Sequence, residues 1–187
     1  MKVDQADTFP ERDHSLRDGR RVRIRAVRPT DEAEILQAFG RMSEEARYLR
    51  FMRAVREPNL DRLRQVLASF PERGLGIVAT VGADDGIDIV GSAVYVTGND
   101  GTGCEFAISV AAEIGGVGLA TALLTALIDT ARERGISEME GFVLAVNQPM
   151  LRLAGRLGFS IRPDPDDASV RICRLRLDGP TLEAGHC

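Results

Sequence analysis

The sequence predicts an α+β protein of three layers, in which helices cover both faces of a mixed, mostly antiparallel sheet of about seven strands. Short apolar or alternating runs, bounded by glycine, asparagine and aspartate, recur along the chain and indicate strands. Longer stretches repeat apolar residues three and four positions apart, as amphipathic helices do. The elements follow the order strand, three helices, three strands, helix, strand, helix and two strands, which favours one layered domain.

Composition excludes several classes of protein. The 187 residues have no obvious internal repeat and suffice for one continuous core. A net charge of −4 argues against a dedicated nucleic-acid binder. Three cysteines without a CxxC motif or a His/Cys cluster argue against a disulfide framework and a metal site. No signal-peptide core or membrane-length apolar run is present, so we expect a cytoplasmic protein without a membrane partner.

The domain is expected to span residues 20–178. Residues 1–19 are polar and charged and predict a flexible N-terminal arm, and residues 179–187 predict a loose C-terminal tail. Alternation of apolar and basic residues over 22–27 predicts a half-exposed strand, with its arginines on a solvated face.

Three helices follow this strand. Thr30 is the expected N-cap of the first helix, and Ser43 opens the second. Pro58 and Asn59 precede the third helix, which Pro71 ends. Strands are expected over 74–81 and 87–97, joined by a turn at 83–86, and a further turn at 98–101 leads to the next strand.

The stretch from Cys104 to Arg134 organises the rest of the chain. It predicts a strand to residue 111, a glycine turn at 115–118, and a helix that Gly135 terminates. The first N–H groups of a helix have no internal partner, and glycines let an anion approach them. The turn therefore predicts either an anion site or a tight connection alone. The dinucleotide fingerprint fits poorly, since its third glycine would fall at Thr121.

Beyond this helix the pattern predicts a strand over 139–146, a short helix, and two strands. Asn147 stands where the helix N-cap belongs, with Pro149 in the first turn. The last strands are expected from Gly158 to Ile161 and over 170–177.

Over residues 20–178 the sequence resembles the GNAT superfamily of acyl-CoA N-acyltransferases. Gly115-Gly116-Val117-Gly118-Leu119-Ala120 is similar to the family's Gln/Arg-x-x-Gly-x-Gly/Ala motif, and Asn147 followed by Leu157-Gly158-Phe159 is similar to its Asn…Leu-Gly-Phe segment. Cys104-Glu105-Phe106-Ala107 and Arg47-Tyr48-Leu49-Arg50-Phe51 resemble segments of the bacterial protein lysine acetyltransferases.

The sequence departs from the family pattern at three positions. Gly115 replaces the leading Gln/Arg of the motif, and Val117 stands where a basic residue is frequent. Ala154 replaces the tyrosine that often serves as the general acid. The backbone N–H donors are the same after the first two changes. The diphosphate site is therefore expected to be retained, with one polar side chain fewer.

The resemblance implies acetyl-CoA as co-substrate and no metal. It implies that pantetheine pairs with the strand edge near Ile108 and Val110. It also implies that the diphosphate lies on the N–H groups from Gly116 to Thr121. The expected cofactor-binding residues are Ile108, Val110, Gly115, Gly116, Val117, Gly118, Leu119, Ala120, Thr121 and Asn147. Asn147 is alternatively a helix cap alone.

Acetyl transfer to an amine requires a base, because an alkylammonium has a pKa near 10.4 and is unreactive while protonated. Glu105 is the candidate, and it shares a strand face with the small residues Ala107 and Ser109. The alternative is a solvated or salt-bridged glutamate. Cys104 points to the other face and is expected to be a core residue.

The expected function is transfer of acetyl from acetyl-CoA to a primary amine, in the first place a protein lysine. Tyr48 and Arg50 are the expected acceptor-binding residues, although Tyr48 fits a core position equally well. The alternatives are a small amine or amino acid as acceptor and, in another class, a non-catalytic acyl-CoA-binding module.

Overall fold

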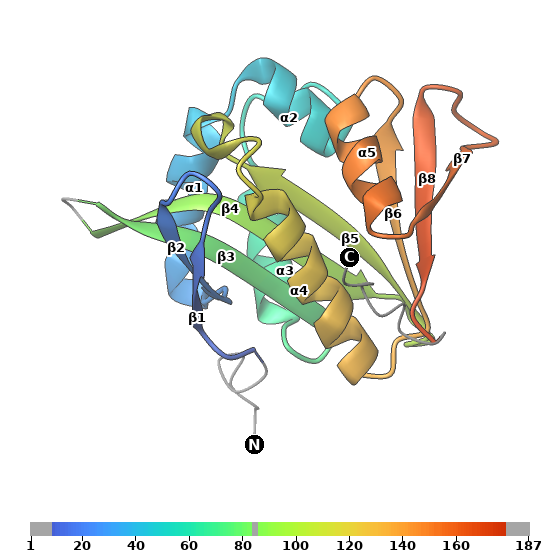
Figure 1. The fold of residues 1–187 in the computed structure, drawn as a ribbon, viewed down its shortest axis with the longest axis horizontal. Helices are drawn as coiled ribbons and strands as arrows, with labels where there is room; N and C mark the ends of the chain where they lie inside the picture. Colours follow the sequence, from blue (N-terminus) through green and yellow to red (C-terminus); the bar gives the residue numbers. More distant parts are fainter. Residues whose placement is uncertain (1–8, 84–85, 179–187) are drawn as a thin grey trace.

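The computed structural model describes residues 9–83 and 86–178, and these residues form one eight-stranded sheet with five α-helices (Figure 1). The strands lie in the order β1-β2-β3-β4-β5-β6-β8-β7, and every pair is antiparallel except β5 and β6. Their bounds are β1 (Arg12–Ser15), β2 (Arg21–Ala26), β3 (Gly74–Ala83), β4 (Gly86–Thr97), β5 (Gly103–Val110), β6 (Glu138–Leu144), β7 (Ser160–Pro163) and β8 (Val170–Arg176). The predicted three-layer mixed sheet is confirmed.

The helices divide between the two faces of the sheet, with α4 and α5 on one face and α1, α2 and α3 on the other (Figure 1). Their bounds are α1 (Glu32–Arg41), α2 (Glu44–Phe51), α3 (Leu60–Ala68), α4 (Leu119–Glu133) and α5 (Gln148–Arg156), with 3-10 turns η2 (Pro29–Asp31) and η3 (Ala112–Ile114). The larger core cluster lies under α4, where Leu119, Leu123 and Leu127 are at most 1% exposed. A smaller cluster lies under α1 and α3.

The N-terminal prediction needs a correction. The sequence predicted a flexible arm to residue 19, but residues 12–15 form β1, which pairs with β2. Phe9 and Leu16 anchor this segment, since both side chains are 4% exposed and belong to the larger core cluster. Two apolar residues among many charged ones were too weak a pattern to predict the strand.

Thr30 is not the N-cap of α1. The 3-10 turn η2 precedes the helix, and Asp31 occupies the cap position without a capping side-chain bond. The Asp31 carboxylate instead accepts two hydrogen bonds from Arg25, at 2.7 and 2.8 Å, and one from the Arg28 N–H at 2.8 Å. Arg25 is therefore buried, whereas the sequence predicted a solvated face for the β2 arginines.

The other helix starts follow the prediction. Ser43, Asn59 and Asn147 each accept a hydrogen bond from the N–H three residues on, as N-caps do. Gly135 has φ +74°, as expected for the residue that ends α4.

The remaining expectations concern segments that are only partly described. The predicted turn at 83–86 includes residues 84 and 85, which lie outside the described residues. Residues 1–8 of the predicted arm and the predicted tail at 179–187 lie outside them as well. Among the residues that the structure describes, no helix is long and apolar enough to cross a bilayer.

Candidate functional site

Strands β5 and β6 separate in the middle of the sheet (Figure 1). They pair in parallel only from Gly103–Glu138 to Glu105–Glu140, although β5 continues to Val110 and β6 to Leu144. On its other side β5 stays paired with β4 along its whole length, from Cys104 to Val110. Within the described part of the chain, the second half of β5 therefore presents an unpaired edge toward β6.

Alternation along β5 identifies the groups at this edge. Ala111 N–H donates to Val90 O on β4 at 2.9 Å, whereas Thr102 O accepts from Ser137 N–H just before β6 at 2.9 Å. Main-chain groups of a strand alternate in direction, so odd-numbered residues bond toward β4 and even-numbered ones toward β6. The N–H and C=O groups of Ile108 and Val110 consequently face the gap. These are the two positions predicted to pair with pantetheine.

Phe106 and Gly141 lie where the pairing stops. A Cβ at Gly141 would be 2.4 Å from the Phe106 ring, so no larger residue fits there. The same ring packs against Phe159, with centroids 5.2 Å apart. Sequence reasoning missed this pair, because neither residue carries a recognisable chemical signal. Phe106 fills the α4 side of the sheet where the two strands part.

The glycine turn leads directly from this edge into α4. Gly118 is the N-cap with φ +100°, a conformation that favours glycine, and no side chain caps the helix there. The first intrahelical bond runs from Ala122 N–H to Gly118 O at 3.1 Å. The N–H groups of Leu119, Ala120 and Thr121 therefore have no intrahelical acceptor. Space at Gly116 is open, since no atom of the described residues lies within 4 Å of a Cβ position there.

Glu105 lies on the opposite face of β5 from α4, and its side chain is exposed. Ala107 and Ser109 share this face, and Ser109 lies 3.9 Å from the Met42 sulfur. Glu140 on β6 is level with Glu105, but Glu140 accepts a 2.9 Å bond from Arg174. No ion pair is recorded for Glu105 itself within residues 9–83 and 86–178, so the salt-bridge alternative finds no partner there.

Helix α2 brings Arg50 toward Glu105. Burial lowers the pKa of Arg50, and the Glu105 carboxylate acts in the opposite direction, so the two charges interact. Arg50 also stacks on the Phe51 ring at 5.0 Å. Tyr48, on the same helix, is 46% exposed and is therefore not a core residue. Both predicted acceptor residues thus line the same side of the sheet as Glu105.

Two further sequence-predicted residues have clear positions. Asn147 caps α5, with its side-chain oxygen 3.2 Å from Met150 N. Cys104 is buried, and burial raises the pKa of its thiol to about 12. A thiol with this pKa is almost entirely protonated at neutral pH, so Cys104 is a core residue and not a nucleophile.

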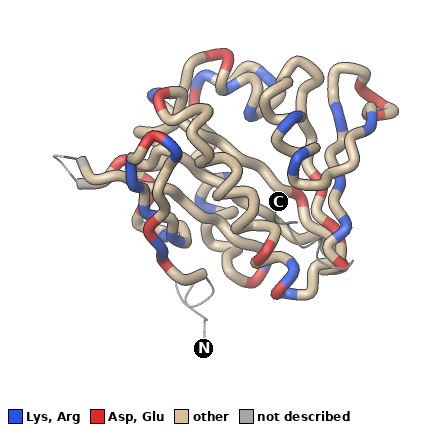
Figure 2. Tube along the Cα trace, viewed as in Figure 1, with Lys and Arg blue, Asp and Glu red and all other residues tan. Residues whose placement is uncertain are grey.

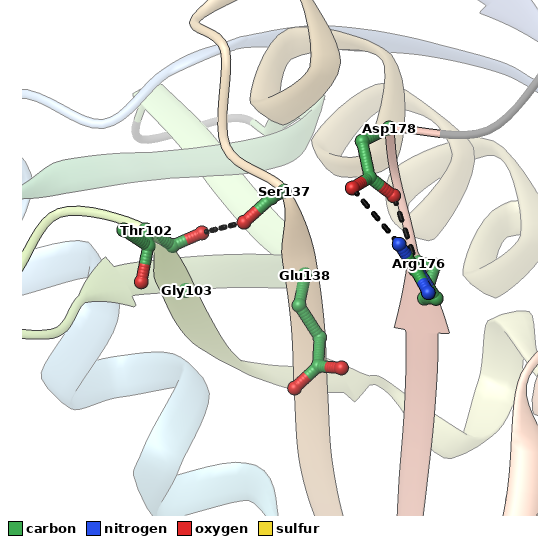
Figure 3. Close-up of a pocket in the computed structure, with 6 residues that line it drawn as sticks. All are labelled: Thr102, Gly103, Ser137, Glu138, Arg176 and Asp178. Carbon is green, nitrogen blue, oxygen red and sulfur yellow. Dashed lines mark hydrogen bonds and ion pairs between the residues drawn. The ribbon is translucent and has the colours of Figure 1, made fainter.

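A polar hollow lies at the other end of β5 from the glycine turn (Figure 3). Thr102, Gly103, Ser137, Glu138, Arg176 and Asp178 line it. Its groups are already paired, because Ser137 Oγ donates to Thr102 O at 2.7 Å and Arg176 binds Asp178. The β5 edge and the glycine turn lie elsewhere, so this hollow takes no part in the candidate site.

A sequence model described as an acetyltransferase (GNAT) domain matches residues 21–160. The chain is also 35% identical over 170 residues to "Acetyltransferase PA5475" of Pseudomonas aeruginosa, a match that covers 89% of this chain and 91% of that protein.

Solved structures agree on the fold. The GNAT domain of S. lividans PAT superposes with a TM-score of 0.79 at 24% identity, covering 89% of this chain and 96% of that one. The structure of yncA from Salmonella typhimurium, solved with its cofactor acetyl-CoA, gives a TM-score of 0.63 at 22% identity and covers 85% and 95% of the two chains.

Proposed function

Because the chain belongs to the GNAT family of acetyltransferases, we propose that it transfers the acetyl group of acetyl-CoA to a protein lysine, with Glu105 as the general base. Acetyltransferases of this family use acetyl-CoA, so the open questions are the acceptor and the residues that act on it. The observation that carries the proposal concerns Glu105, whose exposed side chain has no ion-pair partner among residues 9–83 and 86–178. It lies on the strand whose free edge begins one residue later.

The acetyl-CoA site fits the groups that the chain offers. Pantetheine carries amide groups, and the main-chain N–H and C=O of Ile108 and Val110 face a gap in which an added strand could pair. The diphosphate is an anion, and the free N–H groups of residues 119–121 suit it. The N–H of Ile108 is also suitably directed to stabilise the oxyanion that forms on the thioester carbonyl.

Glu105 would remove the proton from the ammonium group before attack, directly or through a water molecule. Its neighbours Ala107 and Ser109 are small and leave space over the strand. Arg50 adds positive charge near the carboxylate. Ala154 supplies no acid, and a thiolate leaves without one.

A protein acceptor is supported by the outer surface of α2. Tyr48, Phe51 and Met52 are 46%, 36% and 39% exposed. Tyr48 lies three and four positions before Phe51 and Met52, so the three side chains share one surface at the C-terminal end of α2. A macromolecule presenting its lysine to Glu105 would contact this surface. The similarity of the Arg47–Phe51 segment to protein lysine acetyltransferases points to the same acceptor class.

An amino acid is the second candidate acceptor, and Arg50 is the observation that favours it. The Arg50 guanidinium has no recorded ion pair within the described part of the chain. An amino acid would place its ammonium at Glu105 and its carboxylate at Arg50.

Replacement of Glu105 tests the role of the base. Glu105→Gln should lower kcat by about 10²- to 10⁴-fold at neutral pH with CoA affinity unchanged, and activity should recover as pH approaches the pKa of the amine. Glu140→Gln is the matched control, because Glu140 lies beside Glu105 on β6 but is paired with Arg174. Full activity of Glu105→Gln at neutral pH would rule out Glu105 as the base.

The acceptor is tested by thiol release from acetyl-CoA with a panel of amines, amino acids and lysine-containing proteins. A protein acceptor predicts that Tyr48→Ala raises KM for proteins and leaves kcat unchanged. An amino-acid acceptor predicts that Arg50→Gln raises KM for amino acids but not for simple alkylamines. CoA binding without thiol release from any acceptor class would contradict both.

A further inference from the structure

The glycine turn carries no cation of its own. Residues 115–121 are Gly-Gly-Val-Gly-Leu-Ala-Thr, and the nearest charged residue before them is Glu113. The GNAT motif that this turn resembles has polar or basic residues where Gly115 and Val117 stand. A diphosphate bound on the N–H groups here would therefore lack a compensating charge from the turn itself.

The hairpin between β1 and β2 is fixed onto this turn. Arg17 N–H donates to Val117 O at 3.1 Å, and the Arg20 guanidinium donates twice to Glu113 O at 3.2 Å. A hydrogen bond from Leu16 N–H to Arg20 O at 2.8 Å closes the hairpin, and the buried Leu16 side chain attaches it to the core. Figure 2 shows the charged hairpin tip beside the loop that leads into α4.

The side chain of Arg17 extends from this hairpin over the start of α4. Its Nε lies 3.5 Å, and its Cγ 3.8 Å, from the position that a Cβ would take at Gly118. Arg17 is exposed, and no hydrogen bond or ion pair to its guanidinium is recorded among residues 9–83 and 86–178. Its neighbour Asp18 is not available as a partner, since Asp18 binds Arg20 at 2.6 Å.

We infer that Arg17 binds the diphosphate of acetyl-CoA and supplies the cation that the glycine turn lacks. A guanidinium offers several donors in a plane and pairs with phosphate oxygens in a bidentate manner. The backbone bond to Val117 O already holds the main chain of Arg17 at the turn, so ligand binding has to order only its side chain. The inference rests on the proposed acetyl-CoA site.

The Arg17 contact also explains how the N-terminal segment contributes to the site. The hairpin adds an edge strand to the sheet, yet its tip reaches the start of α4, far along the chain. Its anchoring through Leu16 would then serve ligand binding as well as packing.

Calorimetric titration with CoA and with 3′-dephospho-CoA tests the inference. Arg17→Gln should weaken both ligands about tenfold, because both carry the diphosphate and a hydrogen bond to a charged group is lost. Arg17→Lys should recover part of the affinity. The salt dependence of binding should also decrease, since one ionic contact is removed.

Arg21→Gln is the matched control. Arg21 is an exposed arginine of the same hairpin, but the strand alternation turns it to the opposite face from the buried Val22, which packs under α4. Arg21→Gln removes the same positive charge as Arg17→Gln, but it should leave the affinities for CoA and 3′-dephospho-CoA unchanged.

Three outcomes would overturn the inference. Equal CoA affinity of Arg17→Gln and the wild type would remove Arg17 from the site. A loss with CoA that disappears with 3′-dephospho-CoA would assign Arg17 to the 3′-phosphate instead. An equal loss in Arg21→Gln would show only a general charge effect. Absence of CoA binding by the wild-type protein would instead contradict the proposed function, so the two failures are distinguishable.

Discussion

Arg25 and Asp31 form a buried ion pair between β2 and η2, with side chains that are 7% and 6% exposed. Two parallel hydrogen bonds join them, and Asp31 also accepts from the Arg28 N–H. Nothing in the local sequence distinguishes Arg25 from the exposed Arg23 two positions earlier. Only the placement of η2 over the strand decides which arginine is buried.

Removal of one partner should be costly, because the other charge is left buried without compensation. Asp31→Asn is expected to lower the free energy of unfolding by about 3–5 kcal/mol, measured by urea denaturation at pH 7. Glu32→Gln is the control, since the Glu32–Arg64 pair is more exposed and solvent weakens the attraction between its charges, so its loss should change stability little. A loss at Asp31 no larger than at Glu32 would contradict this account.

The Arg25–Asp31 ion pair also makes the stability of the protein depend on pH in the acid range. Burial alone would raise the pKa of Asp31, but the hydrogen bonds from Arg25 and the Arg28 N–H outweigh it and lower the pKa below 3.8. The stability that the carboxylate contributes is complete above the ordinary value and is lost as pH falls through the lowered pKa. The acid-induced loss of stability should therefore be smaller in Asp31→Asn than in the wild type.

The two described cysteines should be inert in the folded protein. Burial raises the pKa of Cys104 to about 12 and that of Cys173 to about 11. In a Cys187→Ser variant, a thiol-reactive disulfide reagent at pH 8 should label neither residue until denaturant is added, when both should react. Fast labelling of one thiol in the folded variant would show that a cysteine is accessible.

At the scale of elements, prediction succeeded at two helix starts. Ser43 and Asn147 cap their helices as expected, because a cap depends on residues within one turn. The cap predicted at Thr30 was wrong, because the carboxylate of Asp31 binds Arg25 of β2 and a 3-10 turn precedes α1.

Prediction also failed at β1, whose existence depends on Phe9 and Leu16 reaching a distant core. The close approach of Phe106 to Gly141 at the end of the ladder between β5 and β6 was likewise invisible, because it joins two strands that are far apart in the sequence.

The turn before α4 gives a sharp test at this scale. Gly118→Asp should abolish measurable CoA binding in calorimetry, because the new carboxylate would repel the diphosphate and lies within reach of Arg17. Gly135→Asp is the control: it introduces the same side chain at another glycine with positive φ, at the far end of the helix. Equal CoA affinity of a folded Gly118→Asp and the wild type would exclude the turn as the site.

At the scale of the whole molecule, the fold and the family could be inferred from the order of elements and three short motifs. The free edge of β5 at Ile108 and Val110 and the glycine turn before α4 lie on residues that the sequence indicated, and the role of Glu105 as the base stays a prediction. The position of Arg17 could not be inferred, because it depends on the hairpin between β1 and β2 folding back onto the start of α4. A contact between residues that are far apart in the sequence leaves no pattern in the neighbouring residues from which it could be predicted.

The composition of the chain limits its self-modification. Lys2 is the only lysine, so the protein offers one side-chain amine besides its own N-terminus. Intact mass after incubation with acetyl-CoA should show at most about two added acetyl groups, whatever the activity toward other proteins. Stable addition of several acetyl groups would contradict amine specificity.

Strands β5 and β6 are joined by a ladder of only three residue pairs. On the proposed function, the pantetheine arm of the co-substrate pairs with the free part of β5 and takes the place of a further strand between β5 and β6. Occupancy would then stiffen the protein: a ligand at a hundred times its Kd adds about 2.7 kcal/mol to the free energy of unfolding. Proteolysis follows the population of open forms, so a cell short of acetyl donor would degrade this enzyme faster. The lifetime of the protein would thereby follow the supply of its own substrate.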